Sequence, residues 1–218
     1  MPLARRPSKI LCVGRNYAAH AAELGSDVPS EPLIFLKPPS AVIGDGDPIV
    51  VPGWAGRIEH EGEIGIVIGS PARNAVVDDA WTHVAGIVPL NDVTARELQR
   101  RDGQWSRAKG FDSFCPIGTP AAATGKDPQA LEVVTRVNGV VRQHGRASAM
   151  AFPISYLIAY CSTFTTLEEG DVLATGTPEG VGPLVPGDVV EVEIPGVGCI
   201  ANPVIADNAP GPEPRRKA

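Results

Sequence analysis

The chain has 218 residues, a formal net charge of −6 and a hydrophobic content of 43%. A chain of this length can bury a core within one domain, and this hydrophobic content is typical of a globular protein. The negative charge argues against a nucleic-acid partner, because binding to phosphates rests on clustered Lys and Arg. No apolar stretch approaches the roughly 18 residues that a membrane span needs. We therefore expect a cytoplasmic protein with no membrane partner.

Glycine and proline are abundant, with 24 and 22 residues. They favour many short strands and turns over long helices. The cysteines show no C-x-x-C spacing and are Cys12, Cys115, Cys161 and Cys199. Reduced and mostly buried thiols are expected, rather than a zinc site or a disulfide framework. The sequence predicts one catalytic domain over residues 1–206 and a flexible, proline-rich tail over 207–218.

The first predicted elements are a strand and a short helix. Residues 9–14 (KILCVG) form an apolar run that predicts the strand. The helix is predicted over residues 16–24, with Asn16 as its N-cap and Gly25 just beyond its end.

Two polar residues lie on one face of this predicted helix. His20 and Glu23 are three positions apart, so their side chains are neighbours and Glu23 could orient the imidazole. Taken alone, such a pair is more often an exposed surface contact of little importance.

Strand-like segments separated by Gly or Pro follow, at residues 41–44, 48–51 and 59–69. In the last segment, EHEGEIGIVIG, the strand period of two places Glu61 and Glu63 on one face and the isoleucines on the other. Like charges at this separation repel each other, and a divalent cation is one way to compensate them. A solvated strand face is the more common reason for such a pair.

A third carboxylate follows the apolar run over residues 84–90, which Pro89 interrupts. Thr94 and Glu97 have the spacing of a capping box, which predicts the start of a helix. Asp92 would then be free to meet the two glutamates, although Asp92 could itself be the N-cap. Three carboxylates without a Cys or His cluster favour a hard cation, Mg²⁺ or Mn²⁺ with Ca²⁺ possible, over zinc.

Two segments contain further candidates for binding a substrate. Lys109, flanked by glycine and aromatic residues, could reach a substrate oxygen or could equally be a solvated lysine. The glycine-rich GTPEGVG around Thr177 could present backbone amides to an anion, but a plain turn is more common.

The last third of the chain predicts a hairpin, a helix and two strands. Asn138 and Gly139 separate two strand-like runs and predict a two-residue hairpin turn. Pro153 precedes ISYLIAYCSTF, which predicts a buried helix with proline in its first turn. Two turn-and-strand units close the fold, at residues 168–178 and 186–198.

Five motifs occur in a characteristic order: GRNYAAHAAELG, HEGEIGIVIG, NDVTARELQ, KGFDSFCPIG and TGTPEGVG. In this order they resemble the fumarylacetoacetate hydrolase family, from about residue 9 to residue 205. The resemblance is greatest to the compact single-domain branch of acylpyruvases, fumarylpyruvate hydrolases and oxaloacetate decarboxylases or tautomerases. It implies an α+β, β-rich fold, a mixed β-sandwich or β-roll with few short helices. It also implies a homodimer and a role in aromatic catabolism.

The resemblance assigns expected roles to nine residues. The metal, Mg²⁺ or Mn²⁺, would be bound by Glu61, Glu63 and Asp92. The catalytic residues would be His20, Glu23 and Lys109. The residues that face a small 2-oxo acid substrate would be Arg96, Gln99 and Thr177. His20 and Glu23 would form a water-activating dyad on a mobile lid over residues 15–27.

The leading hypothesis is hydrolysis of a C–C bond in an acylpyruvate, such as fumarylpyruvate or acetylpyruvate, with pyruvate enolate as the leaving group. The same site could decarboxylate or tautomerise oxaloacetate, or isomerise 2-hydroxyhepta-2,4-diene-1,7-dioate. A non-enzymatic alternative is a binding module stabilised by a metal, which predicts a closed metal site.

Overall fold

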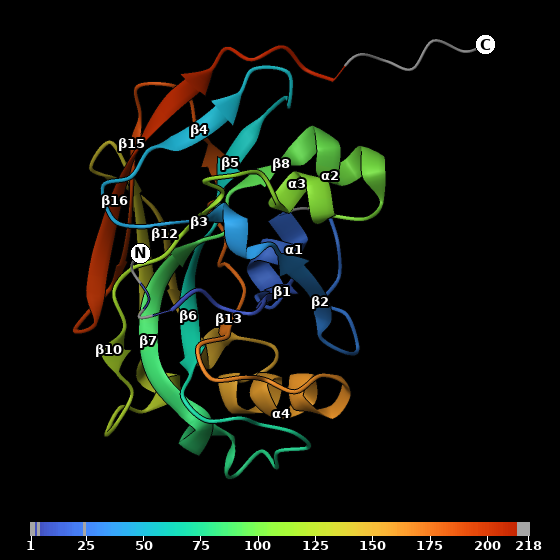
Figure 1. The fold of residues 1–218 in the computed structure, drawn as a ribbon, viewed down its shortest axis with the longest axis vertical. Helices are drawn as coiled ribbons and strands as arrows, with labels where there is room; N and C mark the ends of the chain where they lie inside the picture. The colour runs from blue at the N-terminus through green and yellow to red at the C-terminus, as the bar shows by residue number, and fades with distance from the viewer. Residues whose placement is uncertain (1–2, 4, 24, 213–218) are drawn as a thin grey trace.

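A computed structural model describes residues 3, 5–23 and 25–212. Two β-sheets contain most of the strand residues in this part of the chain, and its four α-helices are short and lie to one side of them (Figure 1). The arrangement confirms the predicted β-rich α+β fold with few short helices.

The larger sheet has six strands in the order β10-β7-β6-β13-β1-β2. Strands β1 and β13 are parallel, and the other neighbours are antiparallel. The strands are β1 (Ile10–Gly14), β2 (Leu33–Lys37), β6 (Gly62–Ile68), β7 (Val84–Asn91), β10 (Ala121–Ala122) and β13 (Val172–Ala174).

The second sheet has five strands in the order β12-β11-β15-β16-β4. Its strands are β4 (Ile49–Pro52), β11 (Glu132–Val137), β12 (Val140–Arg146), β15 (Val189–Ile194) and β16 (Gly198–Asp207). Asn138 and Gly139 join β11 to β12 with φ angles of 53° and 76°. Positive φ at both positions is typical of the tight turn that Asn-Gly favours, so the hairpin prediction is confirmed.

Short strands and helices connect the two sheets. A three-stranded group contains β5 (Ile58–His60), β8 (Thr94–Ala95) and β14 (Gly182–Pro183), and a pair contains β3 (Val42–Ile43) and β9 (Cys115–Pro116). The α-helices are α1 (Ala18–Glu23), α2 (Arg96–Asp102), α3 (Ser106–Lys109) and α4 (Ile154–Phe164). Single 3-10 turns lie at Pro39–Ala41, Ala80–His83, Pro128–Ala130 and Ala147–Ala149.

The main core lies between the two sheets and under α4. Ile64 and Ile66 of β6 are buried in one apolar cluster with Val133 of β11, Val192 of β15 and Leu157 of α4. Burying each such side chain stabilises the fold by roughly 1.5–3 kcal/mol. This packing fixes β6, the strand that contains Glu63.

One predicted strand is divided, and two other predicted elements are confirmed. The run at residues 59–69 is not one strand, because it divides into β5 and β6 at Glu61. The apolar run at residues 84–90 forms β7, which continues through Pro89 to Asn91. Helix α4 follows Pro153 as predicted and buries one side, while Tyr156 and Phe164 are exposed on the other.

Both predicted helix caps are also wrong. Asn16 is not the cap of α1, because its side-chain oxygen accepts a hydrogen bond from the Phe152 N–H. Residue 24, the predicted last residue of that helix, lies outside the described residues. Thr94 and Glu97 form no capping box: the Thr94 hydroxyl donates to the Asp92 carbonyl, and the Glu97 carboxylate accepts from the Arg57 N–H.

Further predictions concern the C-terminal tail, membrane-spanning helices and the cysteines. Strand β16 continues through Asp207, which is one residue into the predicted tail, and residues 213–218 lie outside the described part. Within residues 3, 5–23 and 25–212, no helix is long and apolar enough to cross a membrane. All four cysteines are free thiols, and Cys12, Cys115 and Cys161 are buried whereas Cys199 is exposed. This agrees with the prediction of reduced and mostly buried thiols.

Gly62 tests how closely the two sheets pack beside the site. A Cβ atom there would overlap the buried Thr135 hydroxyl of β11, whereas a Cβ at Gly198 meets no atom within 4 Å. We expect Gly62→Ala to reduce the free energy of unfolding by about 1–3 kcal/mol, because it overpacks the interface. Gly198→Ala is the matched control and should unfold like the wild type. Equal melting temperatures for the two variants would contradict this packing.

Candidate active site

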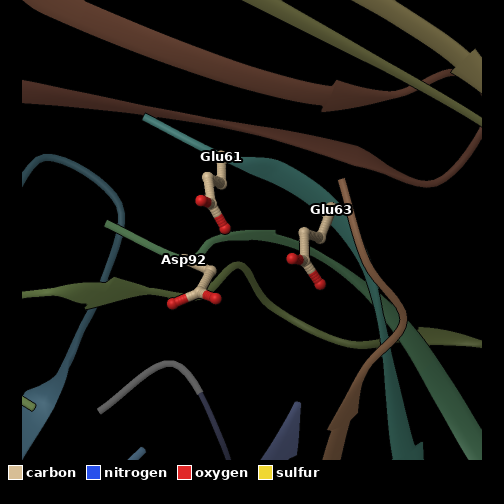
Figure 2. A group of neighbouring side chains, drawn as sticks. All are labelled: Glu61, Glu63 and Asp92. Atoms are coloured by element: carbon tan, nitrogen blue, oxygen red, sulfur yellow. The ribbon is translucent and has the colours of Figure 1, made fainter. Parts of the chain in front are cut away.

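Strands β6 and β7 bring three carboxylates together. The Asp92 N–H donates to the Glu61 carbonyl at 2.8 Å, and the Glu61 N–H donates to the Asn91 side chain at 3.0 Å. Glu63 follows two positions later in β6, opposite Leu90 of β7. Figure 2 shows the three acidic side chains converging, and their nearest oxygens all lie within 4.8 Å of one another.

Buried cations from other elements contact this cluster. Lys109 of α3 donates to Glu61 at 2.7 Å and to Asp92 at 2.6 Å. Lys37, at the end of β2, donates to the other Asp92 oxygen at 2.6 Å. Arg96 of α2 forms ion pairs with Glu61 and with a fourth buried carboxylate, Glu59. These contacts offset much of the free energy needed to bury the carboxylates.

The two glutamates have pKa values shifted in opposite directions. Burial raises the pKa of Glu63 well above its ordinary value, and the charges of Asp92 and Glu61 raise it further. Burial also acts to raise the pKa of Glu61, but Lys109 and Arg96 outweigh it and hold that pKa below its ordinary value. Glu63 accepts a hydrogen bond from the Gly176 N–H and has no ion pair among the described residues. No lysine or arginine of the described residues therefore stabilises the ionised form of Glu63.

The cluster fits a hard divalent cation. All of its donors are carboxylate oxygens, which suit Mg²⁺ or Mn²⁺ better than zinc. A cation would neutralise Glu63, the member that the lysines and Arg96 do not pair with. The residues that could hold such an ion are the three predicted ones, Glu61, Glu63 and Asp92.

A pocket of about 330 Å³ opens onto this cluster. Its lining includes all of the predicted site residues except Asp92, namely His20, Glu23, Glu61, Glu63, Arg96, Gln99, Lys109 and Thr177. Asp92 is fully buried and contacts the pocket residue Lys109. Residues that are widely separated in the sequence therefore share one pocket.

His20 and Glu23 lie at one side of this pocket on α1. The His20 Nδ1 atom is 3.4 Å from a Glu23 carboxylate oxygen, and the imidazole is buried whereas Glu23 is partly exposed. Both Glu23 oxygens also lie 3.2 Å from the Gly180 N–H. Glu23 thus links α1 to the loop after β13. With a proton on Nδ1, the imidazole Nε2 is left able to accept another.

A buried hydrogen-bond network positions Thr177. Its hydroxyl donates to the Gly62 carbonyl at 2.9 Å and accepts from the Gln143 amide at 2.7 Å. The Gln143 oxygen in turn lies 3.0 Å from both the Gly62 N–H and the His60 ring. The second N–H of the Gln143 amide donates to the Pro178 carbonyl at 2.7 Å, so the hydrogen-bonding capacity of this side chain is fully used and strand β12 helps to fix the pocket wall.

Several residues of this site are not predicted by the sequence patterns. Lys37 ends the apolar strand LIFLK, and a lysine in such a run could have been recognised as a buried charge that needs a partner. Glu59 belongs to the predicted strand segment at residues 59–69, but the sequence does not indicate that it joins the cluster of buried carboxylates. No pattern in the sequence indicates a role for Gln143, because that role depends on the packing of one sheet against the other.

Comparison with known proteins identifies the family to which this chain belongs. The model of the fumarylacetoacetate (FAA) hydrolase C-terminal domain matches residues 9–205. The chain is 45% identical over 199 residues to the mitochondrial oxaloacetate tautomerase of Arabidopsis thaliana, which covers 88% of this chain and 89% of that protein.

Two solved structures are similar to this chain in both sequence and fold. The 5-carboxymethyl-2-hydroxymuconate delta-isomerase of Mycobacterium smegmatis is 47% identical with a TM-score of 0.86, over 94% of this chain and 81% of that one. The fumarylpyruvate hydrolase of Pseudomonas aeruginosa, solved in complex with Mn²⁺ and pyruvate, is 32% identical with a TM-score of 0.87, over 92% and 91%. These relatives are enzymes, and the chain belongs to the fumarylacetoacetate hydrolase family.

Proposed function

We propose that this chain is a Mg²⁺- or Mn²⁺-dependent hydrolase that cleaves a C–C bond of an acylpyruvate. The observation that carries the proposal is the buried trio of carboxylates at a pocket that His20 and Lys109 also line. A relative of the same fold, the fumarylpyruvate hydrolase, was solved with Mn²⁺ and pyruvate, which supports both the metal and the type of product.

The metal would be held by Glu61, Glu63 and Asp92. When bound, it would polarise the oxygens of the 2-oxo acid and stabilise negative charge that develops there. Lys109 would act on the same end of the substrate. Two of its N–H donors are used by Glu61 and Asp92, so the third is free to donate to a substrate oxygen.

His20 would act as the general base. Its Nδ1 is oriented by Glu23, and its Nε2 would take a proton from the water that attacks the carbonyl remote from the 2-oxo acid. The C–C bond then breaks, its electron pair leaves with the pyruvate fragment, and a proton returns to carbon. The remote acyl group is released as a carboxylate.

Three further residues would position the substrate. Gln99 accepts a hydrogen bond from Arg96 at 2.9 Å, so its amide N–H groups are free to donate into the pocket. Arg96 is bound to Glu59, Glu61 and Gln99, and it would act chiefly by fixing these side chains. Thr177 would contribute a pocket wall held in place by Gln143.

Oxaloacetate tautomerisation is the second candidate. The tautomerase of Arabidopsis thaliana matches 88% of this chain at 45% identity, which is the observation that favours it. Keto–enol interconversion moves a proton at the carbon beside the 2-oxo group and needs no attacking water, so the same pocket could perform it. The related delta-isomerase supports isomerisation in the same way. A binding module with a closed metal site is less well supported, because Glu61 and Glu63 line an open pocket. We also propose that the protein forms a homodimer and that residues 15–27 form a mobile lid, as the family resemblance implies.

The metal site leads to a prediction about binding. Glu63→Gln should weaken Mn²⁺ binding about tenfold or more, because it removes one charged ligand. Calorimetric titration of the metal-free protein with MnCl₂ measures this. The same substitution should not lower the melting temperature of the metal-free protein, since the neutral amide resembles the protonated carboxyl that burial and the neighbouring carboxylates favour at Glu63. Asp78→Asn, at an exposed position, is the control. Unchanged Mn²⁺ affinity in Glu63→Gln would refute the site.

The role of His20 leads to a prediction about two reactions. His20→Ala should slow acylpyruvate hydrolysis by about 10²-fold or more, which is the usual contribution of a positioned general base. Oxaloacetate decarboxylation should fall much less, because it needs no activated water. Turnover of acetylpyruvate and of oxaloacetate is measured side by side. His144→Ala, which disrupts an exposed His–Glu pair, is the control. Intact hydrolysis with a collapse of oxaloacetate turnover would favour the tautomerase or decarboxylase.

A further inference from the structure

Glu59 of β5 is a buried carboxylate that has no role of its own in the mechanism above. It is neither one of the three carboxylates that could hold a metal nor, among the described residues, part of the pocket lining. Its side chain is nevertheless bound on both oxygens, by Arg57 at 2.6 Å and by Arg96 at 2.5 Å. A buried carboxylate is unfavourable without such partners, so its contacts indicate what it does.

Arg96 connects Glu59 with the site through three different nitrogens. Its Nε donates to Glu59, and its Nη2 lies 2.6 Å from the Glu61 Oε1 atom. Its Nη1 donates to the Gln99 side-chain oxygen at 2.9 Å. Because the guanidinium group is planar and rigid, holding one nitrogen sets the directions of the other two. Glu59 therefore fixes the orientation in which Arg96 meets Glu61 and Gln99.

The contact with Arg96 determines how Glu61 is turned toward the other ligand residues. Arg96 holds Oε1 of Glu61, and Lys37 holds Oδ1 of Asp92. The second oxygens, Oε2 of Glu61 and Oδ2 of Asp92, both contact the Lys109 Nζ atom, so they face each other across one point. If Arg96 turned away, Glu61 would lose the contact that keeps its Oε2 atom on the side of Asp92.

The backbone joins the elements that carry this pair. Glu59 pairs with Thr94 where β5 and β8 run antiparallel, and the Arg96 N–H donates to the Arg57 carbonyl at 2.9 Å. The Glu59 and Arg96 side chains are both buried, whereas 53% of the Arg57 side chain is exposed. Exposed ion pairs contribute little, so the contact of Glu59 with Arg96 is the one that affects the site.

We propose that Glu59 is a positioning residue of the active site and acts only through Arg96. By orienting this arginine, it keeps Glu61 turned for metal binding and keeps the Gln99 amide turned toward the substrate. Glu59 itself touches neither the metal nor the substrate. The inference rests on the proposed function, because that function places the metal at Glu61 and the substrate at Gln99.

The test is a double-mutant cycle on Mn²⁺ binding, so it does not depend on turnover. Glu59→Gln, Arg96→Gln and the double variant are titrated with MnCl₂ by calorimetry, and thermal unfolding verifies that each is folded. An effect transmitted through Arg96 disappears once Arg96 is replaced, whereas a direct effect of the Glu59 charge on the ion persists. Glu132→Gln, at an exposed glutamate paired with His144 and Arg146, is the matched control for net charge.

Glu59→Gln should weaken Mn²⁺ binding about tenfold, the usual effect of losing a hydrogen bond between charged groups. In the Arg96→Gln background the same substitution should change the affinity by about twofold or less, which is the range of independent sites. Glu132→Gln should bind Mn²⁺ like the wild type. The proposal is wrong if Glu59→Gln leaves the affinity unchanged, or weakens it by the same factor in both backgrounds.

A second cycle measures the substrate side of the site and needs no Arg96 variant. Protein saturated with MnCl₂ is titrated with oxalate, an analogue of the pyruvate enolate. Glu59→Gln should weaken oxalate binding in the wild-type background but not beside Gln99→Ala, a substitution at a half-buried position. Equal weakening in both backgrounds would also overturn the proposal, and this cycle decides if Arg96→Gln does not fold. Coupling in the cycles without acylpyruvate cleavage would uphold Glu59 and reject the hydrolase, whereas a wild type that binds no Mn²⁺ would refute the metal site itself.

Discussion

Four carboxylates buried side by side set the main constraint on this fold: Glu59, Glu61, Glu63 and Asp92. Each buried ion costs several kcal/mol unless nearby charges and hydrogen bonds compensate it. The compensating cations come from separate elements, Lys37 from β2, Arg96 from α2 and Lys109 from α3. These elements must dock where β5, β6 and β7 meet, and the same docking shapes the walls of the pocket.

Not every buried carboxylate of the cluster is paired with a cationic side chain. The unpaired one connects the stability of the fold with its function. Glu61 and Asp92 are paired with lysine or arginine, but Glu63 has no such partner among the described residues. A protein that only needed stability would gain from an uncharged residue at this position. An uncompensated carboxylate in an open pocket is instead suited to binding a cation. The rigid frame of β6 and β7 holds the cluster in place, while α1 and the loop after β13 are joined across the pocket by Glu23.

The sequence predicted the parts of the molecule that depend on local patterns. The period of two placed Glu61 and Glu63 together, and Asn138-Gly139 predicted the hairpin. The errors arose where tertiary contacts decide the outcome. Asn16 has the side chain of a helix cap, but Phe152 and Thr175 occupy it. Lys37 and Gln143 become important only when distant strands pack together, which no spacing in the sequence encodes.

The central claim is that Glu61, Glu63 and Asp92 bind a divalent cation at the bottom of a substrate pocket. Anomalous diffraction from crystals of the protein grown with MnCl₂ tests it most directly. The account predicts one strong manganese peak in contact with oxygens of all three carboxylates. A map with no peak there, and with Lys109 still bridging Glu61 and Asp92 as the sole cation between them, would contradict it.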